Sequence, residues 1–318
     1  MEGIVTTTVD RERLETLSAQ LAALGLSVYW DEPMSAHTTY QIGGPADLFV
    51  PATTETAFIA VIQHVRALGL VPFVMGSGAN LLVADAGIRG VVVQYLGDRS
   101  TFSEEHGEVL VWSEAGKDLK ELARESMDRG YEGLEWAVGV PGTVGGAVVG
   151  NAGAFGGYVC DSLLSVKALQ PDGTVVHLEN AECGFCYRDS KFKQQRREDR
   201  AIILSATLVL RPGVPDEIAE RAAQHTAYRH QRHPKDPSCG SVFKRTDNYP
   251  AGFLIEQCGL KGEQRGQAMI SPQHANYVIN LGGATAVDVK TLIDLAHDQV
   301  KAQFGEDLAL EVELVGEW

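Results

Sequence analysis

The spacing of hydrophobic residues predicts alternating helices and strands over the first two thirds of the chain. Leucines recur every three or four residues over 10–24 and give way to Gly25, which is the pattern of an amphipathic helix with a glycine stop. A second helix is predicted over 54–68, followed by a buried strand over 71–75. The same reasoning predicts a helix over 118–127 and strands at 91–94, 109–112, 164–169, 175–178 and 202–210.

Proline and glycine mark where these elements end. A short strand over 48–50 is expected to stop at Pro51, and the tetrapeptide QPDG at 170–173 predicts a hairpin turn. The sequence RPGVP at 211–215 interrupts the strand pattern and precedes a polar helix, so we place a domain boundary there.

The part beyond this boundary is expected to form a smaller unit of helices and strands. Its last helix is predicted to start at Thr285, with Asp288 as a capping partner, and to stop at Gly305. A terminal strand is predicted over 310–315, with Glu311 and Glu313 on one face and the apolar residues on the other.

Composition narrows the class of protein. A chain of 318 residues is long enough for two or three compact units, and its 44% hydrophobic and 22% charged residues are ordinary for a globular protein. The net charge of −15 argues against binding to nucleic acid or anionic lipid, although a local basic pocket can still hold an anionic small molecule. The sequence shows neither a basic leader with an apolar core nor a long apolar run, so we expect a cytoplasmic protein.

The five cysteines do not suggest a disulfide framework. Cys183 and Cys186 form one C-x-x-C pair, but a structural zinc site needs further ligands at similar spacing and no second pair exists. We therefore interpret them as ordinary thiols and expect no metal site.

Two glycine-rich segments are the strongest indication of a ligand. The segment 138–157 reads VGVPGTVGGAVVGNAGAFGG and contains eight glycines, and the segment 76–80 reads GSGAN. Neither fits a P-loop or a Rossmann fingerprint, yet both offer closely spaced backbone N–H groups that suit a dinucleotide pyrophosphate. The alternative is that each is a set of tight turns. The candidate cofactor-binding residues are Gly76, Ser77, Gly78, Ala79, Asn80, Leu81, Gly139, Gly142, Thr143, Gly145, Gly146 and Asn151.

Three polar residues are candidates for catalysis, each with a simpler alternative. Arg188 in YRDS is either a surface charge or a fixed cation beside a carboxylate or carbanion. Ser241 in CGSVF is either a turn residue or a projecting hydroxyl, and Glu311 is either part of a solvated strand face or a catalytic carboxyl group.

Eight motifs, in order, resemble the UDP-N-acetylenolpyruvoylglucosamine reductase family of bacterial peptidoglycan synthesis. The resemblance covers the chain from approximately residue 36 to its end. It is carried by HTTYQIGGPADLFV, VMGSGANLLVADAGIRGVVV, GLEWAVGVPGTVGGAVVGNAGAFGG, ECGFCYRDSKFK, PSCGSVFKR, AGFLIEQCGLKG, SPQHANYVIN and EVELVGE.

The resemblance implies an α/β (α+β) fold with non-covalently bound FAD. The family has a two-lobed FAD-binding domain of the vanillyl-alcohol-oxidase (PCMH) type and a smaller C-terminal α+β substrate-binding domain. On this sequence we place an N-terminal helical segment at 1–35, the FAD-binding domain at 36–212 and the substrate domain at 213–318.

The resemblance also implies a two-step reaction. NADPH reduces the flavin and leaves, and the enolpyruvyl ether of UDP-N-acetylglucosamine then binds and is reduced to UDP-N-acetylmuramate. By motif, Arg188 would stabilise the enolate-like charge, Glu311 would polarise the carboxylate and Ser241 would protonate the carbon. Tyr187, Arg232 and Lys244 are expected to contact the anionic substrate, and no obligate protein partner is expected.

Two positions depart from the family pattern, and two other functions stay open. Glu313 lies where the family usually has arginine, and Phe253 replaces a common lysine or tryptophan. A flavin oxidase of the same fold is one alternative, but these often tether the flavin through histidine or cysteine, and neither occurs in 71–91. The other is a nucleotide-binding regulatory protein without catalysis.

Overall fold

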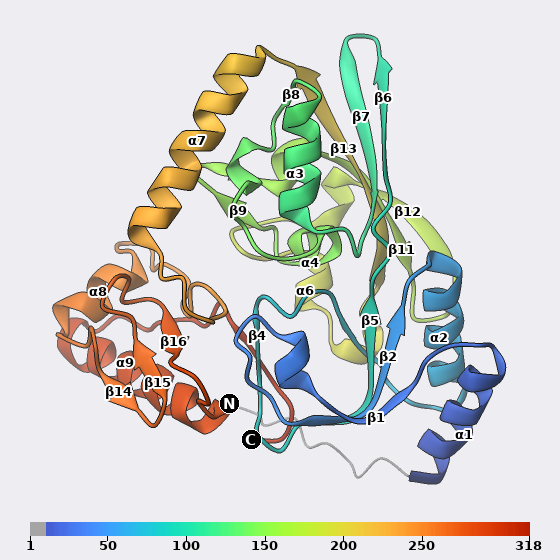
Figure 1. The fold of residues 1–318 in the computed structure, drawn as a ribbon, viewed down its shortest axis with the longest axis horizontal. Coiled ribbons are helices and arrows are strands. Elements are labelled where there is room, and N and C mark those ends of the chain that lie inside the picture. Colours follow the sequence, from blue (N-terminus) through green and yellow to red (C-terminus); the bar gives the residue numbers. More distant parts are fainter. Residues whose placement is uncertain (1–10) are drawn as a thin grey trace.

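The first third of the chain builds a small sheet flanked by two helices. The computed structural model describes residues 11–318, so Asp10 of the predicted first helix lies outside the described residues. The sheet has the order β1-β2-β5-β3, with β1 antiparallel to β2 and the other pairs parallel. Helix α2 packs on β2 and β5, and α1 packs on α2 (Figure 1). These elements are α1 (Arg11–Ala23), β1 (Tyr29–Pro33), β2 (Pro45–Ala52), α2 (Glu55–Ala67), β3 (Phe73–Met75) and β5 (Ile88–Tyr95).

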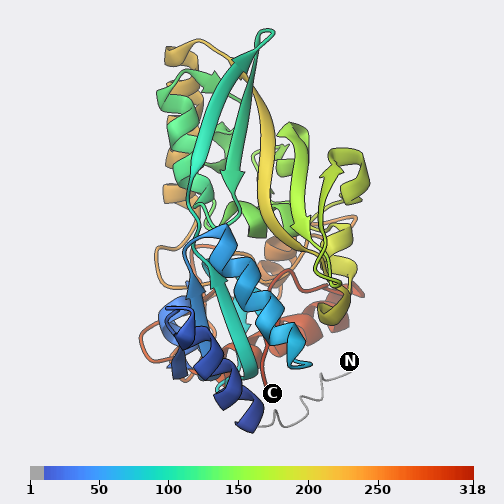
Figure 2. The same ribbon diagram turned by 90° about the vertical axis from the view of Figure 1, so that its right-hand side faces the viewer.

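A larger antiparallel sheet forms the second lobe. Its order is β12-β11-β13-β7-β6, and the short strand β8 pairs with the far end of β13. The two sheets lie one above the other in Figure 2, as the two-lobed prediction requires. The strands and helix are β6 (Ser100–Glu105), β7 (Glu108–Glu114), α3 (Leu119–Asp128), β8 (Tyr131–Glu132), β11 (Leu163–Leu169), β12 (Val175–Glu179) and β13 (Ile202–Pro212).

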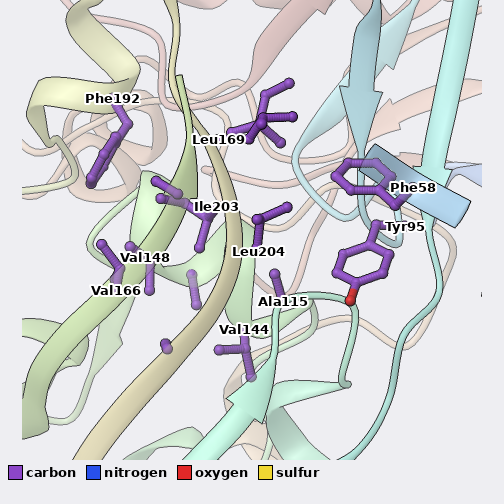
Figure 3. Packing of buried hydrophobic residues seen from close by; sticks show 14 of the residues in the cluster. Phe58, Tyr95, Ala115, Val144, Val148, Val166, Leu169, Phe192, Ile203 and Leu204 are labelled. Carbon is purple, nitrogen blue, oxygen red and sulfur yellow. The ribbon is translucent and has the colours of Figure 1, made fainter. Parts of the chain in front are cut away.

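Short elements join the strands of this lobe, and the most important is α4 (Val144–Val149) inside the long glycine-rich segment. Its side chains Val144 and Val148 point into the core beside Ala115 and Leu204 (Figure 3). The others in this lobe are η2 (Glu135–Ala137), β9 (Gly153–Ala154), β10 (Gly157–Tyr158), α5 (Val159–Ser162), η3 (Asn180–Cys183), α6 (Lys191–Gln194) and η4 (Arg197–Asp199), whereas η1 (Met34–His37) joins β1 and β2 in the first lobe.

The prediction that Pro51 ends a strand is wrong, because β2 runs on to Ala52. Strand β1 pairs with β2 only as far as Phe49, so in the described part of the chain one side of β2 is free at Pro51. A proline is tolerated in such a place because its missing N–H removes no ladder hydrogen bond there.

Helix α7 (Pro215–Arg232) leads from the two lobes to a smaller C-terminal unit (Figure 1). This unit contains α8 (Ala251–Gln257), a three-stranded sheet and α9 (Ala286–Phe304), with a buried core of its own. The sheet is formed by β14 (Gln264–Arg265), β15 (Ala268–Ile270) and β16 (Val278–Asn280). No helix among residues 11–318 is long and apolar enough to cross a membrane.

The chain then returns to the first lobe. Strand β17 (Glu313–Val315) pairs in parallel with β4 (Leu81–Val83), directly after the first glycine-rich segment. The predicted terminal strand over 310–315 is therefore too long at its start. Leu310 forms only an isolated bridge with Phe243, and its side chain is exposed rather than packed in the core.

The start of α9 is capped twice, once by its own residues and once by the first lobe. Thr285 and Asp288 form the predicted capping box. Asp85, 201 residues away from Ala286, also accepts hydrogen bonds from the N–H groups of Ala286 (2.8 Å) and Val287 (3.0 Å). This carboxylate links the C-terminal unit to the lobe that carries the first glycine-rich segment.

We predict that Asp85→Ala destabilises the protein by about 1–2 kcal/mol, because two N–H groups at a helix start lose their acceptor. Urea unfolding followed by circular dichroism measures this. Asp98→Ala, which removes an exposed carboxylate in the same lobe, is the control and should change the free energy of unfolding by less than about 0.5 kcal/mol. Equal effects of the two substitutions would contradict the proposed link.

Candidate active site

The two glycine-rich segments, far apart in sequence, are in direct contact. A Cβ atom at Gly76 would overlap the side chain of Thr143, so only glycine allows this approach. Thr143 is the N-cap of α4 and accepts a hydrogen bond from the N–H of Gly146 at 3.3 Å. The sequence predicted that both segments bind one ligand, and the fold brings them to one place.

The glycines of the long segment divide into two groups. A Cβ at Gly139 would overlap Arg229 and a Cβ at Gly145 would overlap Ala115, so these two glycines serve packing within the protein. Gly142 has a φ of +133° and no neighbouring atom within 4 Å of a Cβ, and Gly146 is exposed. Gly142 and Gly146 therefore leave room beside the backbone on the open side of the segment.

Polar atoms at this junction also fit a phosphate-bearing ligand. The hydroxyl of Ser77 is buried and lacks a hydrogen-bond partner among the described residues. A buried hydroxyl without a partner is costly, and a ligand oxygen would satisfy it. The residues present therefore fit the pyrophosphate of a dinucleotide such as FAD.

Two of the candidate cofactor-binding residues, Asn80 and Asn151, form hydrogen bonds within the protein. Asn80 donates from Nδ2 to the carbonyl of Glu311 at 2.8 Å, and its own carbonyl accepts from the N–H of Glu313 at 2.9 Å. Asn151 donates to the carbonyl of Cys186 at 2.9 Å and accepts from the N–H of Cys160 at 3.2 Å. These amides position neighbouring segments.

Arg188 and Glu311 form an ion pair, with 2.8 Å between Nε and Oε1. Their side chains are only 23% and 18% exposed. Arg188 lies in a turn that is closed by an antiparallel β-bridge between Cys186 and Asp189. Its φ of +56° is left-handed, which is uncommon for a residue other than glycine. The fold thus makes neither residue the plain surface charge of the simpler interpretation.

Burial and the nearby cations shift the pKa of the Glu311 carboxyl group in opposite directions. Burial raises the pKa of its carboxyl group above the ordinary 4.5, although Arg188, Lys193 and Lys244 all favour the charged form. Burial lowers the pKa of the Lys193 amine, and Lys244 lowers it further. Three cations therefore act on the carboxyl group of Glu311, and Glu313 and Asp189 also act on the Lys193 amine.

Ser241 lies beside Glu311 through backbone pairing. The carbonyl of Val242 accepts from the N–H groups of Glu311 (2.8 Å) and Val312 (3.2 Å). Asn276 holds the same loop by exchanging side-chain hydrogen bonds with both backbone groups of Phe243. The three candidate catalytic residues therefore come from three separate segments that meet at Glu311.

The predicted substrate contacts are only partly brought together. The guanidinium of Arg188 lies 5.7 Å from the ring centre of Tyr187, and Lys244 acts electrostatically on Glu311. Arg232 lies at the end of α7, with its guanidinium 5.7 Å from the ring centre of Tyr228.

Sequence reasoning missed Lys193, Arg229 and Tyr277. Lys193 stands in the YRDSKFK motif and Tyr277 in the SPQHANYVIN motif, so the motifs contained both, but no charge pattern singled them out. Tyr277 shares a hydrogen bond of 2.6 Å with His233, and burial raises its pKa to about 12, with smaller opposing effects from Glu311, which raises it, and Arg188, which lowers it.

The C-x-x-C pair lies near the turn of Arg188. Cys183 is buried, Cys186 is exposed, and both are free thiols. Among residues 11–318, no group of three or more His, Cys, Asp or Glu side chains is arranged to hold a metal ion.

Comparison with known proteins defines the class. Residues 46–179 match the FAD binding domain family, and residues 232–315 match the UDP-N-acetylenolpyruvoylglucosamine reductase C-terminal domain family. The two lobes with their glycine-rich junction are thus an FAD-binding domain, and the protein is a flavin-dependent oxidoreductase with NADPH as its second cofactor.

Similar proteins over nearly the whole length identify the family. The reductase of Chloroflexus aurantiacus is 41% identical over 92% of this chain and 99% of its own, and that of Nostoc punctiforme is 41% identical over 90% and 85%. The crystal structure of the enzyme from Thermus caldophilus matches 91% of this chain and 98% of its own, with a TM-score of 0.76 and 33% identity. The chain belongs to the UDP-N-acetylenolpyruvoylglucosamine reductase family.

The raised pKa of Glu311 predicts a pH dependence. Because the folded state favours the protonated carboxyl group, its contribution to stability is complete below the ordinary pKa of 4.5 and is lost as the pH rises through the folded pKa. The melting temperature of the cofactor-free wild type should therefore fall relative to that of Glu311→Gln as the pH rises above the ordinary pKa of 4.5. Differential scanning calorimetry of both proteins tests this, and a constant difference would contradict it.

We predict that alanine substitutions in the two groups of glycines have opposite effects on stability. Gly145→Ala should destabilise the cofactor-free chain by about 1–3 kcal/mol, because the new Cβ overlaps Ala115. Gly146→Ala should preserve or slightly increase that stability, by up to about 1 kcal/mol, because alanine favours the helix and the Cβ meets only open space and Thr143.

The same Gly146→Ala protein should retain less FAD, because its methyl group lies on the open side of the glycine-rich segment. The ratio of flavin absorbance to protein absorbance after purification measures retention, and unfolding of the stripped proteins measures stability. A Gly146→Ala protein with full FAD content would argue against this segment as the cofactor cradle.

Proposed function

We propose that Arg188, Ser241 and Glu311 are the catalytic groups of this flavoprotein. The reaction is the NADPH-dependent reduction of the enolpyruvyl ether of UDP-N-acetylglucosamine to UDP-N-acetylmuramate, a step of peptidoglycan precursor synthesis. The single observation that carries the assignment is the convergence of three distant segments at Glu311.

The cofactor is held by the junction of the two glycine-rich segments. Ser77 offers a buried hydroxyl, and Gly142 and Gly146 leave open space beside it. When bound, FAD supplies the two-electron hydride chemistry that no amino-acid side chain provides. Other candidate residues contact neighbouring parts of the protein and so set the shape of this junction. They are Gly76, Gly139, Gly145, Asn80 and Asn151.

Arg188 binds the carboxylate of the enolpyruvyl group. Reduction of the double bond places negative charge on the carbon next to this carboxylate, and a fixed guanidinium stabilises that charge more than the charge of the ground state. Because Glu311 and the backbone turn already hold Arg188, little reorganisation is needed during the reaction.

Ser241 delivers a proton to that carbon. A serine hydroxyl is a weak acid, so its effect depends on being in place when a strongly basic carbon forms. The neighbouring backbone holds it through hydrogen bonds from Val242 and Phe243 to other segments.

Glu311 has two roles, to orient Arg188 and to interact with the substrate carboxylate in its protonated form. Burial makes the protonated form accessible at a higher pH than for an exposed glutamate. Tyr187, Lys244 and Arg232 are proposed to contact the anionic groups of the substrate, and Lys193 adds a further cation to the site.

We also propose that the protein acts in the cytoplasm, without nucleic acid, membrane or an obligate protein partner. The net charge of −15 opposes binding to polyanions, and the five cysteines are free thiols. NADPH and the UDP-sugar are then its partners.

We predict that Ser241→Ala leaves reduction of the flavin by NADPH near its normal rate and slows reoxidation by the enolpyruvyl substrate about a hundredfold or more. Stopped-flow absorbance of the flavin measures each half-reaction separately. Ser238→Ala, in the same loop, is the matched control and should affect neither half-reaction. Equal slowing of both half-reactions by Ser241→Ala would contradict its role as proton donor.

A further inference from the structure

The side chain of Lys193 lies against the turn that carries Arg188. Lys193 belongs to α6, whose N-cap Ser190 follows this turn, and its backbone N–H donates to the Ser190 carbonyl at 3.0 Å. Its ammonium group reaches back and donates to the carbonyl of Arg188 at 3.4 Å. The half-buried Lys193 therefore contacts the backbone of the residue that we propose to bind the substrate carboxylate.

Two neutral side chains also hold this turn at 186–189. Asn151 donates to its first carbonyl at 2.9 Å, and the hydroxyl of Ser190 donates to the carbonyl of Val149 at 2.7 Å. These two contacts fix the turn to the end of the long glycine-rich segment. Lys193 differs from them because it adds a positive charge as well as a hydrogen bond.

Several neighbouring charges act on the Lys193 amine. Burial lowers its pKa, and the nearby Lys244 lowers it further. Three carboxylates oppose this shift, and Glu313 has a larger effect than Glu311 or Asp189. Glu313 is therefore the main counter-charge of Lys193.

The returning C-terminal chain holds Glu313 in place. This residue begins β17, and its N–H donates to the carbonyl of Asn80 at 2.9 Å. It is also the position at which the chain departs from the family pattern, with a carboxylate in place of arginine. An arginine here would repel Lys193, whereas Glu313 attracts it and also acts on Arg197.

Lys193 in turn acts on Glu311. It is one of three cations that favour the charged form of this carboxyl group, together with Arg188 and Lys244. Arg188 and Lys244 are proposed to bind the anionic substrate, which would offset their charge. The ammonium group of Lys193 instead faces a protein carbonyl, so its charge stays beside Glu311 when the substrate binds.

Two neutral groups complete the titratable surroundings of Glu311. Burial, with a smaller contribution from Glu311, raises the pKa of the Tyr277 hydroxyl and of the Cys239 thiol to about 12. Both groups therefore stay protonated at neutral pH and add no charge. The protonation of Glu311 depends on its burial and on the three cations.

We propose that Lys193 is a positioning residue of the second half-reaction. It fixes the backbone of Arg188, and with Glu313 as its counter-charge it supplies the cation that keeps Glu311 ionised and paired with Arg188 until the substrate carboxylate arrives. Each of these actions passes through another residue. The inference rests on the proposed function, because it explains how Arg188 and Glu311 are prepared for the reaction.

The first test compares both half-reactions of the FAD-loaded full chain by stopped-flow absorbance of the flavin. Lys193→Met should slow reoxidation by the enolpyruvyl substrate about tenfold or more, because a charged hydrogen bond to the turn is lost, and should change reduction by NADPH less than about twofold. Lys193→Arg keeps the charge and the donor, and should recover the rate to within about threefold of the wild type. Lys191→Met removes a cation from the same helix and should affect neither half-reaction.

The pH profile of reoxidation separates this role from a merely structural one. A positive charge favours the ionised carboxyl group, so its removal raises the pKa of Glu311 and lets the protonated form persist to higher pH. Because the protonated form is proposed to act on the substrate carboxylate, the decline of the rate at high pH should move to higher pH in Lys193→Met. The profile of Lys193→Arg should match that of the wild type.

Lys193→Gln keeps a donor without the charge and should show the same shift of the profile. It provides the test if Lys193→Met does not retain FAD. A slower reaction with an unshifted profile in these variants would overturn the inference, because the charge would then have no effect on Glu311.

A double-mutant cycle tests the counter-charge. Glu313→Gln keeps the backbone hydrogen bond of β17 and should slow reoxidation about threefold in the wild type, because the ammonium group loses its main counter-charge. In the Lys193→Met background the same substitution should change the rate less than about 1.5-fold. An equal effect in both backgrounds would show that Glu313 acts independently of Lys193 and would overturn its role as counter-charge.

The outcomes distinguish this inference from the proposed function. Wild-type protein that does not oxidise NADPH with the enolpyruvyl substrate would refute the proposed function itself. Normal wild-type turnover, combined with normal reoxidation and an unshifted pH profile in Lys193→Met, would refute only this inference. Equal slowing of both half-reactions by Lys193→Met would also overturn it, since Arg188 and Glu311 are proposed to act in the second half-reaction alone.

Discussion

The structure depends on the return of the C-terminal chain to the first glycine-rich segment. Asn80 holds Glu311 with its side chain and Glu313 with its backbone, and β17 then extends the contact alongside β4. These hydrogen bonds place the carboxyl group of Glu311 against Arg188 and the adjoining backbone against the Ser241 loop. One asparagine thus connects the proposed cofactor cradle to the proposed catalytic groups, and displacement of the terminal segment would separate the cradle from these groups.

Close backbone approach explains most of the glycine content at the site. Gly76 and Gly145 are required by neighbouring protein atoms, whereas Gly142 and Gly146 face open space. Sequence alone cannot distinguish these two kinds, because both read as glycine in a loop. The distinction matters for the proposed cofactor cradle, since the packed glycines set its shape and the open ones leave space beside the backbone.

The regular elements were predictable because their hydrophobic spacing is clear. The hairpin at 170–173, the helix start at Thr285 and the interruption of the strand pattern by prolines and glycine before α7 are all present in the structure. The domain boundaries at 35 and 212 stay predictions, and the chain crosses back over the second one through β17. Helix α4 escaped prediction because glycine disfavours helices, and here the burial of Val144 and Val148 outweighs that cost.

The candidate site was predictable as a list of residues but not as an arrangement. The motifs named Arg188, Ser241 and Glu311, whereas the pairing of Glu311 with Arg188 and the loop that holds Ser241 depend on contacts between distant segments. The strand predicted around Glu311 was too long, since alternation of polar and apolar residues cannot show where a partner strand begins. Lys193 was missed because its burial and its action on Glu311 are properties of the fold.

The late position of β17 has a consequence for the order of events during biosynthesis. Glu311 and β17 form the hydrogen bonds with Asn80, and β17 pairs with β4, whereas the other strands of both lobes are synthesised some hundred residues earlier. The lobes can therefore collapse during translation before the proposed catalytic groups assemble, because that assembly requires the later synthesis of Glu311 and β17. A nonsense codon just before Glu311 would leave most of both buried cores intact and yet remove one of the proposed catalytic groups.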